Sequence, residues 1–223
     1  MAVSARVERI GPLAGILGAT FVAVCSVIAA LVYSGTVGEG FSPLNHWISE
    51  LGEEGVSQMA ALFNLGIMVG GICLGIFMTA LGLLRRTKLA WLYVPVGIVA
   101  GIGGMFVGVY PMSSNGPHIP AALTFFVLGW IAVGLASIDL WRRPDARFPR
   151  WLPWLGALTV AAFLIFLSLY VPYLTYTGAG SPDRAPFQLV VVFEWLVLVG
   201  IMGWVLVASV SWWRHRNDAR SAA

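Results

Sequence analysis

One glutamate lies inside a long apolar stretch, where an ionisable side chain is costly. Glu194 stands about eight residues into a stretch that begins near Phe187, which places it ~12 Å below that point at roughly 1.5 Å of helical rise per residue. A charge at such a depth in a bilayer costs about 2.5–3.5 kcal/mol on insertion scales. Low dielectric disfavours the charged form of a carboxyl group. We therefore expect Glu194 to be protonated or strongly hydrogen-bonded at neutral pH, and to face a partner, a ligand or water rather than lipid.

The link between the first two apolar stretches carries the next candidate residues. Ser42 is a suitable helix N-cap, and the proline that follows it suits the first helical position. Apolar residues then recur every three or four positions, and Gly52 is a suitable stop. The sequence therefore predicts a short amphipathic helix over Ser42–Leu51 at the outer membrane interface.

Polar side chains gather in the links and helix ends on this outer side. The candidate ligand-binding residues are His46, Ser49, Glu50, Asn64, Ser114, Asn115, His118 and Glu194. His118 and Glu194 come from different apolar stretches, and we expect both to face one outer cavity with Ser49 or Asn64 nearby. The reason is the cost of burying Glu194 without a polar partner.

Three interpretations of this cluster stay open. In the first it is structural: His46 and Glu50 form a surface pair of little value, Asn64 bonds across helices, and His118 caps a helix. In the second it binds a lipid headgroup or another small polar ligand. In the third it is a catalytic or metal site, since His46, Glu50, His118 and Glu194 could satisfy zinc. Nothing in the spacing requires a metal, and the sequence identifies no cofactor.

The elements that must position these residues are membrane helices. The chain of 223 residues is 59% hydrophobic and 10% charged, whereas a soluble domain has about 25% charged residues. A bilayer core requires about 20 apolar residues per helix. We expect an all-α transmembrane bundle of six helices that forms one domain over residues 1–223. The expected spans are roughly 10–33, 60–84, 90–109, 121–140, 152–173 and 187–213.

The basic residues predict the orientation of this bundle. Twelve of the 13 Lys and Arg residues flank the spans on the side of the termini, and only Arg184 lies on the other side. The positive-inside rule therefore predicts a multi-pass protein of the plasma membrane, or cell inner membrane, with both termini in the cytoplasm. A net charge of +3 would suggest nucleic acid in a soluble chain, but here these residues set orientation, and no nucleic acid partner is expected.

Two further patterns concern packing and the inner side. Glycines recur every three or four positions over 97–108, and Gly71 and Gly75 form a GxxxG pair, which predicts close helix packing. On the inner side, Asp139 is most simply an ion pair with Arg142 or Arg143 in its own helix. Few other polar groups are expected to matter there.

Four short segments, in this order, resemble a known superfamily. They are His46-Trp-Ile-Ser-Glu-Leu-Gly52, Gly104-Met-Phe-Val-Gly-Val-Tyr-Pro111, His118-Ile-Pro-Ala-Ala-Leu-Thr-Phe-Phe126 and Phe193-Glu-Trp195. Over nearly the whole chain they resemble the Frag/DRAM/Sfk-type six-helix membrane proteins and their prokaryotic relatives, which are catalogued as a domain of unknown function. Glu50 stands where the eukaryotic members usually have Asp, and Tyr110-Pro111 replaces their Phe-Gln, so the chain is more similar to the prokaryotic relatives.

The resemblance implies lipid handling, because the eukaryotic members are linked to lipid remodelling, phospholipid organisation and lysosomal control. The residues that it marks are Ile48, Ser49, Gly52, His118, Phe125, Glu194 and Trp195. We expect a non-enzymatic membrane protein that binds a lipid or a partner protein through an outer-leaflet polar pocket. The alternatives are a membrane enzyme that acts on lipid, with His118 and Glu194 as acid and base or metal ligands, and a structural subunit of a larger membrane complex.

Overall fold

The computed structural model describes residues 4–114, 116–176 and 185–221. The regular secondary structure within these ranges is helical, and turns and coil connect the helices. The elements are α1 (Ala5–Val32), a short 3-10 helix η1 (Ile48–Gly52), α2 (Ala60–Arg85), α3 (Ala90–Val109), α4 (His118–Arg142), α5 (Leu152–Tyr176) and α6 (Leu189–Ser221). The six α-helices are each long and apolar enough to cross a membrane. The predicted six-helix membrane bundle is therefore confirmed.

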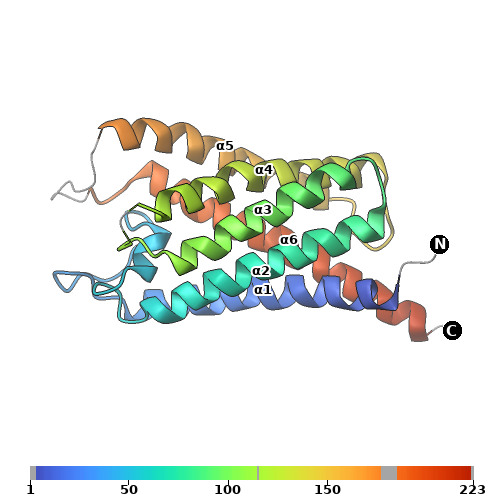
Figure 1. Cartoon of the computed structure of the whole chain (residues 1–223), viewed down its shortest axis with the longest axis horizontal. Coiled ribbons are helices and arrows are strands. Elements are labelled where there is room, and N and C mark those ends of the chain that lie inside the picture. The colour runs from blue at the N-terminus through green and yellow to red at the C-terminus, as the bar shows by residue number, and fades with distance from the viewer. Residues whose placement is uncertain (1–3, 115, 177–184, 222–223) are drawn as a thin grey trace.

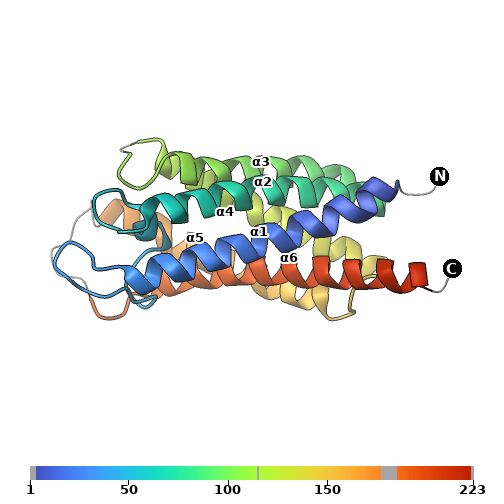
Figure 2. The same cartoon turned by 90° about the horizontal axis from the view of Figure 1, so that it is seen from below.

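The six helices form a closed ring. Each helix packs against the next one along the chain, and α6 returns to pack against α1 (Figures 1 and 2). Both termini lie at one end of the bundle, which we call the basal end. The opposite end, here the distal end, carries the α1–α2 link (33–59) and the α3–α4 link (110–117).

The α1–α2 link does not form the predicted helix over Ser42–Leu51. The backbone N–H groups of Asn45 and His46 both donate to the carbonyl of Ser42, which closes a single turn. Trp47 is then extended, with φ −60° and ψ 147°, and a 3-10 helix begins only at Ile48. The side chain of Glu50 accepts the Trp47 N–H at 2.8 Å and so fixes the start of η1.

The short helix η1 is buried against the bundle. Ile48 and Leu51 are 8% and 0% exposed, and η1 contacts α1, α2 and α6. The element therefore lies between the distal ends of the helices. A helix of five residues can be buried in this way because neighbouring side chains satisfy its terminal backbone groups.

Two helix starts differ from the predicted spans in a way that matters for the site. Helix α4 begins at His118, three residues before the predicted span, because Pro120 is tolerated in the first helical turn. Helix α6 begins at Leu189, and Glu194 follows five residues later. Glu194 is therefore only ~8 Å from the start of its helix at 1.5 Å per residue, not ~12 Å. This shallower position brings its side chain to the level of η1.

Large side chains fill the middle and basal part of the ring. Phe77 on α2 and Trp204 on α6 are both fully buried, and their rings meet edge to face with centroids 6.1 Å apart. Phe163 and Trp212 are also fully buried nearby along the same core. Tight packing of this kind, more than hydrophobic burial, holds helices together in a bilayer.

The glycines of α2 and α3 allow the two backbones to touch, as their spacing predicted. A Cβ atom added at Gly71 would collide with the carbonyl oxygen of Gly101, and one added at Gly101 would lie 2.5 Å from the carbonyl oxygen of Gly71. A Cβ added at Gly108 would meet the backbone of Asn64. Substitution at these positions would therefore force the helices apart.

Candidate functional site

A cavity of about 130 Å³ lies inside the ring and extends from the distal end to about the middle of the helices. Its polar lining side chains are Ser49 from η1, His118 from α4 and Glu194 from α6. Apolar side chains, glycines and Cys73 form the rest of its wall. On α6 the lining runs from Glu194 to Val205, which spans ~16 Å along the helix at 1.5 Å per residue. The cavity therefore has a polar end and a long apolar interior.

Glu194 connects α6 to the buried 3-10 helix. Its side chain is 7% exposed, and its Oε2 atom accepts the backbone N–H of Ile48 at 2.8 Å. This N–H belongs to the first turn of η1 and has no partner within that helix. The strong hydrogen bond predicted for Glu194 is thus present, and its donor is a backbone group from a different part of the chain.

The first turns of α6 hold the α1–α2 link at two further points. The indole Nε1 of Trp195 donates to the carbonyl of His46 at 3.2 Å. The backbone N–H of Gln188 donates to the carbonyl of Leu44 at 2.8 Å. Glu194 therefore lies in a seam of hydrogen bonds between α6 and the link, which fixes its position beside the cavity.

Only one carboxyl oxygen of Glu194 is used in this seam. Oε1 takes part in none of the hydrogen bonds found within the described ranges. Because the side chain lines the cavity, this oxygen is the group that Glu194 can offer to a ligand. A carboxyl oxygen accepts hydrogen bonds when ionised and can donate one when protonated.

His118 also keeps one atom for a ligand. Its Nδ1 lies 2.8 Å from the carbonyl oxygen of Tyr110. A carbonyl oxygen can only accept, so Nδ1 must carry the hydrogen, and Nε2 of the neutral ring is then an acceptor. The bond to the end of α3 orients the imidazole at the start of α4, where the side chain lines the cavity.

Ser49 completes the polar end of the cavity. Its hydroxyl donates to the Sδ atom of Met112 at 3.5 Å, and a thioether is a weak acceptor. The hydroxyl oxygen keeps its lone pairs for another donor. Ser49, His118 and Glu194 come from three separate elements, and all three line one cavity, as predicted for His118 and Glu194 with Ser49 nearby.

His46 and Glu50 have structural roles and do not line this cavity. They are 3% and 4% exposed, so they are not the surface pair considered from sequence. Glu50 accepts from the backbone of Trp47 and, at 3.4 Å, from the hydroxyl of Tyr33. The His46 ring packs edge-on against Tyr33, with centroids 5.4 Å apart, and its Nδ1 lies 3.2 Å from the N–H of Ser42. Both residues thus shape the α1–α2 link.

Asn64 and Ser114 lie outside the cavity wall. Asn64 is buried, and its Nδ2 donates to the carbonyl of Gly52 at 3.0 Å, which fastens the end of η1 to α2. Ser114 forms a turn in the α3–α4 link through its N–H and the carbonyl of Pro111. Asn115 falls outside the described residues. Three of the eight predicted residues, Ser49, His118 and Glu194, therefore share the cavity.

The predicted metal ligands do not come together. Within the part of the chain that the structure describes, no three His, Cys, Asp or Glu side chains form a group that could hold a metal ion. His46 and Glu50 are engaged in the link, while His118 and Glu194 line the cavity. A zinc site built from these four residues is therefore not supported by their arrangement.

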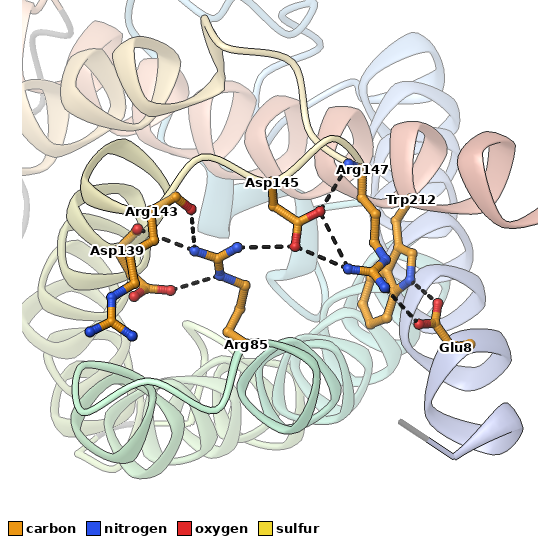
Figure 3. Close-up of polar contacts among 7 residues, drawn as sticks. All are labelled: Glu8, Arg85, Asp139, Arg143, Asp145, Arg147 and Trp212. Carbon is orange, nitrogen blue, oxygen red and sulfur yellow. Dashed lines mark hydrogen bonds and ion pairs between the residues drawn. The ribbon is translucent and has the colours of Figure 1, made fainter. Parts of the chain in front are cut away.

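Sequence reasoning missed a second polar cluster, at the basal end (Figure 3). Arg85 and Asp139 have side chains only 6% and 2% exposed, and Arg85 Nε lies 2.9 Å from Asp139 Oδ2. Arg85 also meets Asp145 at 3.1 Å and donates to the carbonyl of Arg143. The prediction that Asp139 pairs with Arg142 or Arg143 in its own helix is therefore wrong, because the ring brings the end of α2 beside the end of α4.

The same cluster continues to α1 and α6. Arg147 pairs with Asp145 at 3.0 Å and with Glu8 at 3.4 Å. Glu8 in turn accepts the indole Nε1–H of Trp212 at 2.6 Å. The chain of contacts joins α1, α2, α4, the α4–α5 link and α6 (Figure 3). The sequence contained a signal for this cluster: Asp139 lies near the end of one apolar span, and Arg85 lies at the end of another.

Comparison with known proteins gives a family but no function. A family model described as "Protein of unknown function (DUF998)" matches residues 17–211, which is most of the chain and includes every lining residue of the cavity that lies in α2, α3, α4 and α6. No curated protein and no solved structure matches. An uncharacterised family agrees with the resemblance to a domain of unknown function, whereas membership of the Frag/DRAM/Sfk-type superfamily stays a prediction.

Proposed function

We propose that this chain, which belongs to the DUF998 family, is a non-enzymatic membrane protein that holds a lipid chain in its distal cavity. The observation that carries the proposal is the continuity of one cavity from Ser49, His118 and Glu194 to an apolar interior. A lipid has the same two parts, since a polar group is joined to a long hydrocarbon chain. The binding of a partner protein through this pocket has no comparable support.

The length of the cavity supports a lipid occupant. Its lining spans ~16 Å along α6, and the hydrocarbon core of a bilayer is about 30 Å thick, so one leaflet contributes about half of that. At the inner end of this lining, Phe77 and Trp204 fill the ring. An occupant would therefore have its polar group at the distal end and its chain directed to the bilayer centre.

The basic residues indicate which leaflet this is. The basal end carries 12 of the 13 Lys and Arg residues, so we place it in the cytoplasm and the distal end outside a plasma or inner membrane. The lipid would then come from the outer leaflet.

Cysteines introduced at positions 115 and 221 should react with an impermeant reagent from opposite sides of the membrane. Labelling of both from outside intact cells would reverse or remove this part of the proposal.

Filling the cavity tests the proposal directly. Gly104 is the lining glycine at which an added Cβ meets its nearest atom only at 3.5 Å, whereas Gly15, Gly18, Gly70 and Gly71 are all tighter. Gly104→Leu should therefore fold and occupy the space of the lipid chain. Gly203→Leu is the matched control, because a Cβ at Gly203 meets nothing within 4 Å and the residue does not line the cavity.

The measurement is the amount of lipid that copurifies with each variant, determined by native mass spectrometry after extraction in a mild detergent. We expect wild type and Gly203→Leu to retain one lipid per chain, and Gly104→Leu to lose most of it. Equal lipid retention by all three proteins would show that the cavity does not hold the lipid.

A second candidate function is a membrane enzyme that acts on lipid. It is favoured by one observation: the Nε2 atom of His118 and the Oε1 atom of Glu194 are both unused and belong to side chains that line the same cavity. Such a pair can serve as general base and general acid. Incubation of the purified protein with bound lipid tests this, since an enzyme converts the lipid and its Glu194→Gln variant does not. An unchanged lipid in both proteins supports the binding function.

A further inference from the structure

The polar end of the cavity is poorly suited to an anionic headgroup. Every Lys and Arg in the ranges that the structure describes lies at the basal end, and Arg184 falls outside those ranges. The described acidic residues at the distal end are Glu39, Glu50, Glu53, Glu54 and Glu194. Phosphate groups are normally bound by Arg, Lys or clusters of backbone N–H groups. A phosphate at this end of the cavity would instead meet the carboxyl group of Glu194.

The charge at the lining residues disfavours an anion in every protonation state except one. Glu194 is either neutral or negative, and in neither state does it attract an anion. A protonated His118 together with an ionised Glu194 leaves the polar lining without net charge, because Ser49 is neutral. The lining has a net positive charge, and so pairs well with a lipid phosphate or a fatty-acid carboxylate, in one state alone. In that state Glu194 and His118 are both protonated.

The unused hydrogen-bonding atoms match a hydroxyl group. His118 Nε2 accepts, Ser49 keeps lone pairs on its hydroxyl oxygen, and Glu194 Oε1 either accepts or donates. A ligand hydroxyl both donates and accepts, so it can satisfy His118 and Glu194 together. A cationic amine would also meet Glu194, but placing a charge beside a carboxyl group that is 7% exposed carries a large desolvation cost.

The polar end must decide which lipid is bound. A hydrocarbon chain is already in an apolar medium within the bilayer, so its transfer into the cavity gains no hydrophobic free energy and only improves packing. The discrimination among lipids therefore comes from the groups that meet Ser49, His118 and Glu194. Resting on the function proposed above, we infer that the ligand is an uncharged lipid with a free hydroxyl group, either an acylglycerol or a long-chain alcohol.

The test compares probes that share one oleoyl or oleyl chain and differ only in the polar end. They are 1-monooleoylglycerol, oleyl alcohol, oleic acid, oleoyl lysophosphatidylglycerol and oleylamine. Each is titrated into delipidated full-length protein and followed by native mass spectrometry. We expect at least one of the two hydroxyl lipids to bind about tenfold more tightly than the anionic and cationic probes, which corresponds to one or two well-formed hydrogen bonds. Tighter binding of 1-monooleoylglycerol would identify the ligand as an acylglycerol, and tighter binding of oleyl alcohol would identify it as a long-chain alcohol.

Variants separate failure of this inference from failure of the function itself. If all five probes bind equally and Gly104→Leu abolishes binding, the cavity holds lipid but the headgroup inference is wrong. If lysophosphatidylglycerol binds most tightly and Arg184→Gln removes that preference, the inference is also overturned, and Arg184 is the phosphate ligand. If Gly104→Leu leaves the binding of every probe unchanged, the proposed function fails as well. Loss of hydroxyl selectivity in Ser49→Ala or His118→Leu, with chain binding retained, supports the inference.

Discussion

The two ends of the bundle each bury carboxylates, but they surround them differently. At the basal end, Asp139 meets Arg85 at 2.9 Å, and the contacts continue to Asp145, Arg147 and Glu8. At the distal end, Glu194 meets a backbone N–H at 2.8 Å, and its other oxygen belongs to a side chain on the wall of a cavity. The basal group is matched by opposite charge, while the distal group is matched only in part.

This difference supports the proposal that the basal end is structural and that the distal end binds a ligand. A buried ion pair whose partners are all within the protein fastens helices but offers nothing to a ligand. A buried carboxyl group that uses one oxygen within the protein and lines a cavity can offer its other oxygen to a ligand. In this chain a hydroxyl-bearing lipid is the group that we propose for that role.

The largest effect is expected from breaking the basal cluster. Arg85→Ala would leave Asp139 buried without its partner, and such changes cost about 3–5 kcal/mol. Lys88→Ala is the control, because Lys88 is exposed in the link between α2 and α3, three residues after Arg85. The unfolding free energy in mixed micelles, measured by titration with sodium dodecyl sulfate, should fall only in the first variant.

A double variant sharpens this test. Arg85→Met combined with Asp139→Leu removes both charges, and well-packed apolar replacements of a buried pair are often neutral or stabilising. We expect the double variant to recover most of the stability lost in Arg85→Ala. A small loss in Arg85→Ala, no larger than in Lys88→Ala, would contradict the view that the basal pair fastens α2 to α4.

At the distal end the effect depends on the shape of the replacement. Glu194→Leu leaves the Ile48 N–H buried without an acceptor, which costs about 1–3 kcal/mol, whereas Glu194→Gln keeps an acceptor and should cost less than about 1 kcal/mol. The same micelle titration measures both. A loss in Glu194→Gln as large as that in Arg85→Ala would mean that Glu194 also holds a charged partner, and the contrast between the ends would disappear.

A smaller effect than that of Glu194→Leu is expected at Asn64. Asn64→Ala removes the bond to the carbonyl of Gly52, which is worth about 1 kcal/mol. Because this bond holds the end of η1, we expect faster proteolysis within the α1–α2 link and little change at the basal end. Thr20→Ala is the control, since the Thr20 hydroxyl bonds only within α1. Equal proteolysis of the two variants would show that η1 is held without Asn64.

The sequence alone determined the helices and the glycine faces through which α2 and α3 pack closely. A run of about 20 apolar residues can satisfy its backbone only as a helix in lipid, so hydropathy is enough to predict six spans. Gly71 and Gly101 were likewise readable, because glycine spacing on a helix face is a local property. The need of Glu194 for a polar partner also followed from its position in an apolar stretch.

Only the tertiary structure decided which groups these residues meet. The sequence offered Asp139 an arginine three or four positions away, yet the closed ring supplied Arg85 from another helix. Ser42–Leu51 had the pattern of a helix, but its side chains and backbone bond to Tyr33 and α6. The segment therefore forms a turn and a buried 3-10 helix. A local pattern describes spacing along one helix. The partners of a side chain and the shape of a cavity depend instead on how the helices close into a ring, because the packing of α6 against α1 brings together residues far apart in the chain.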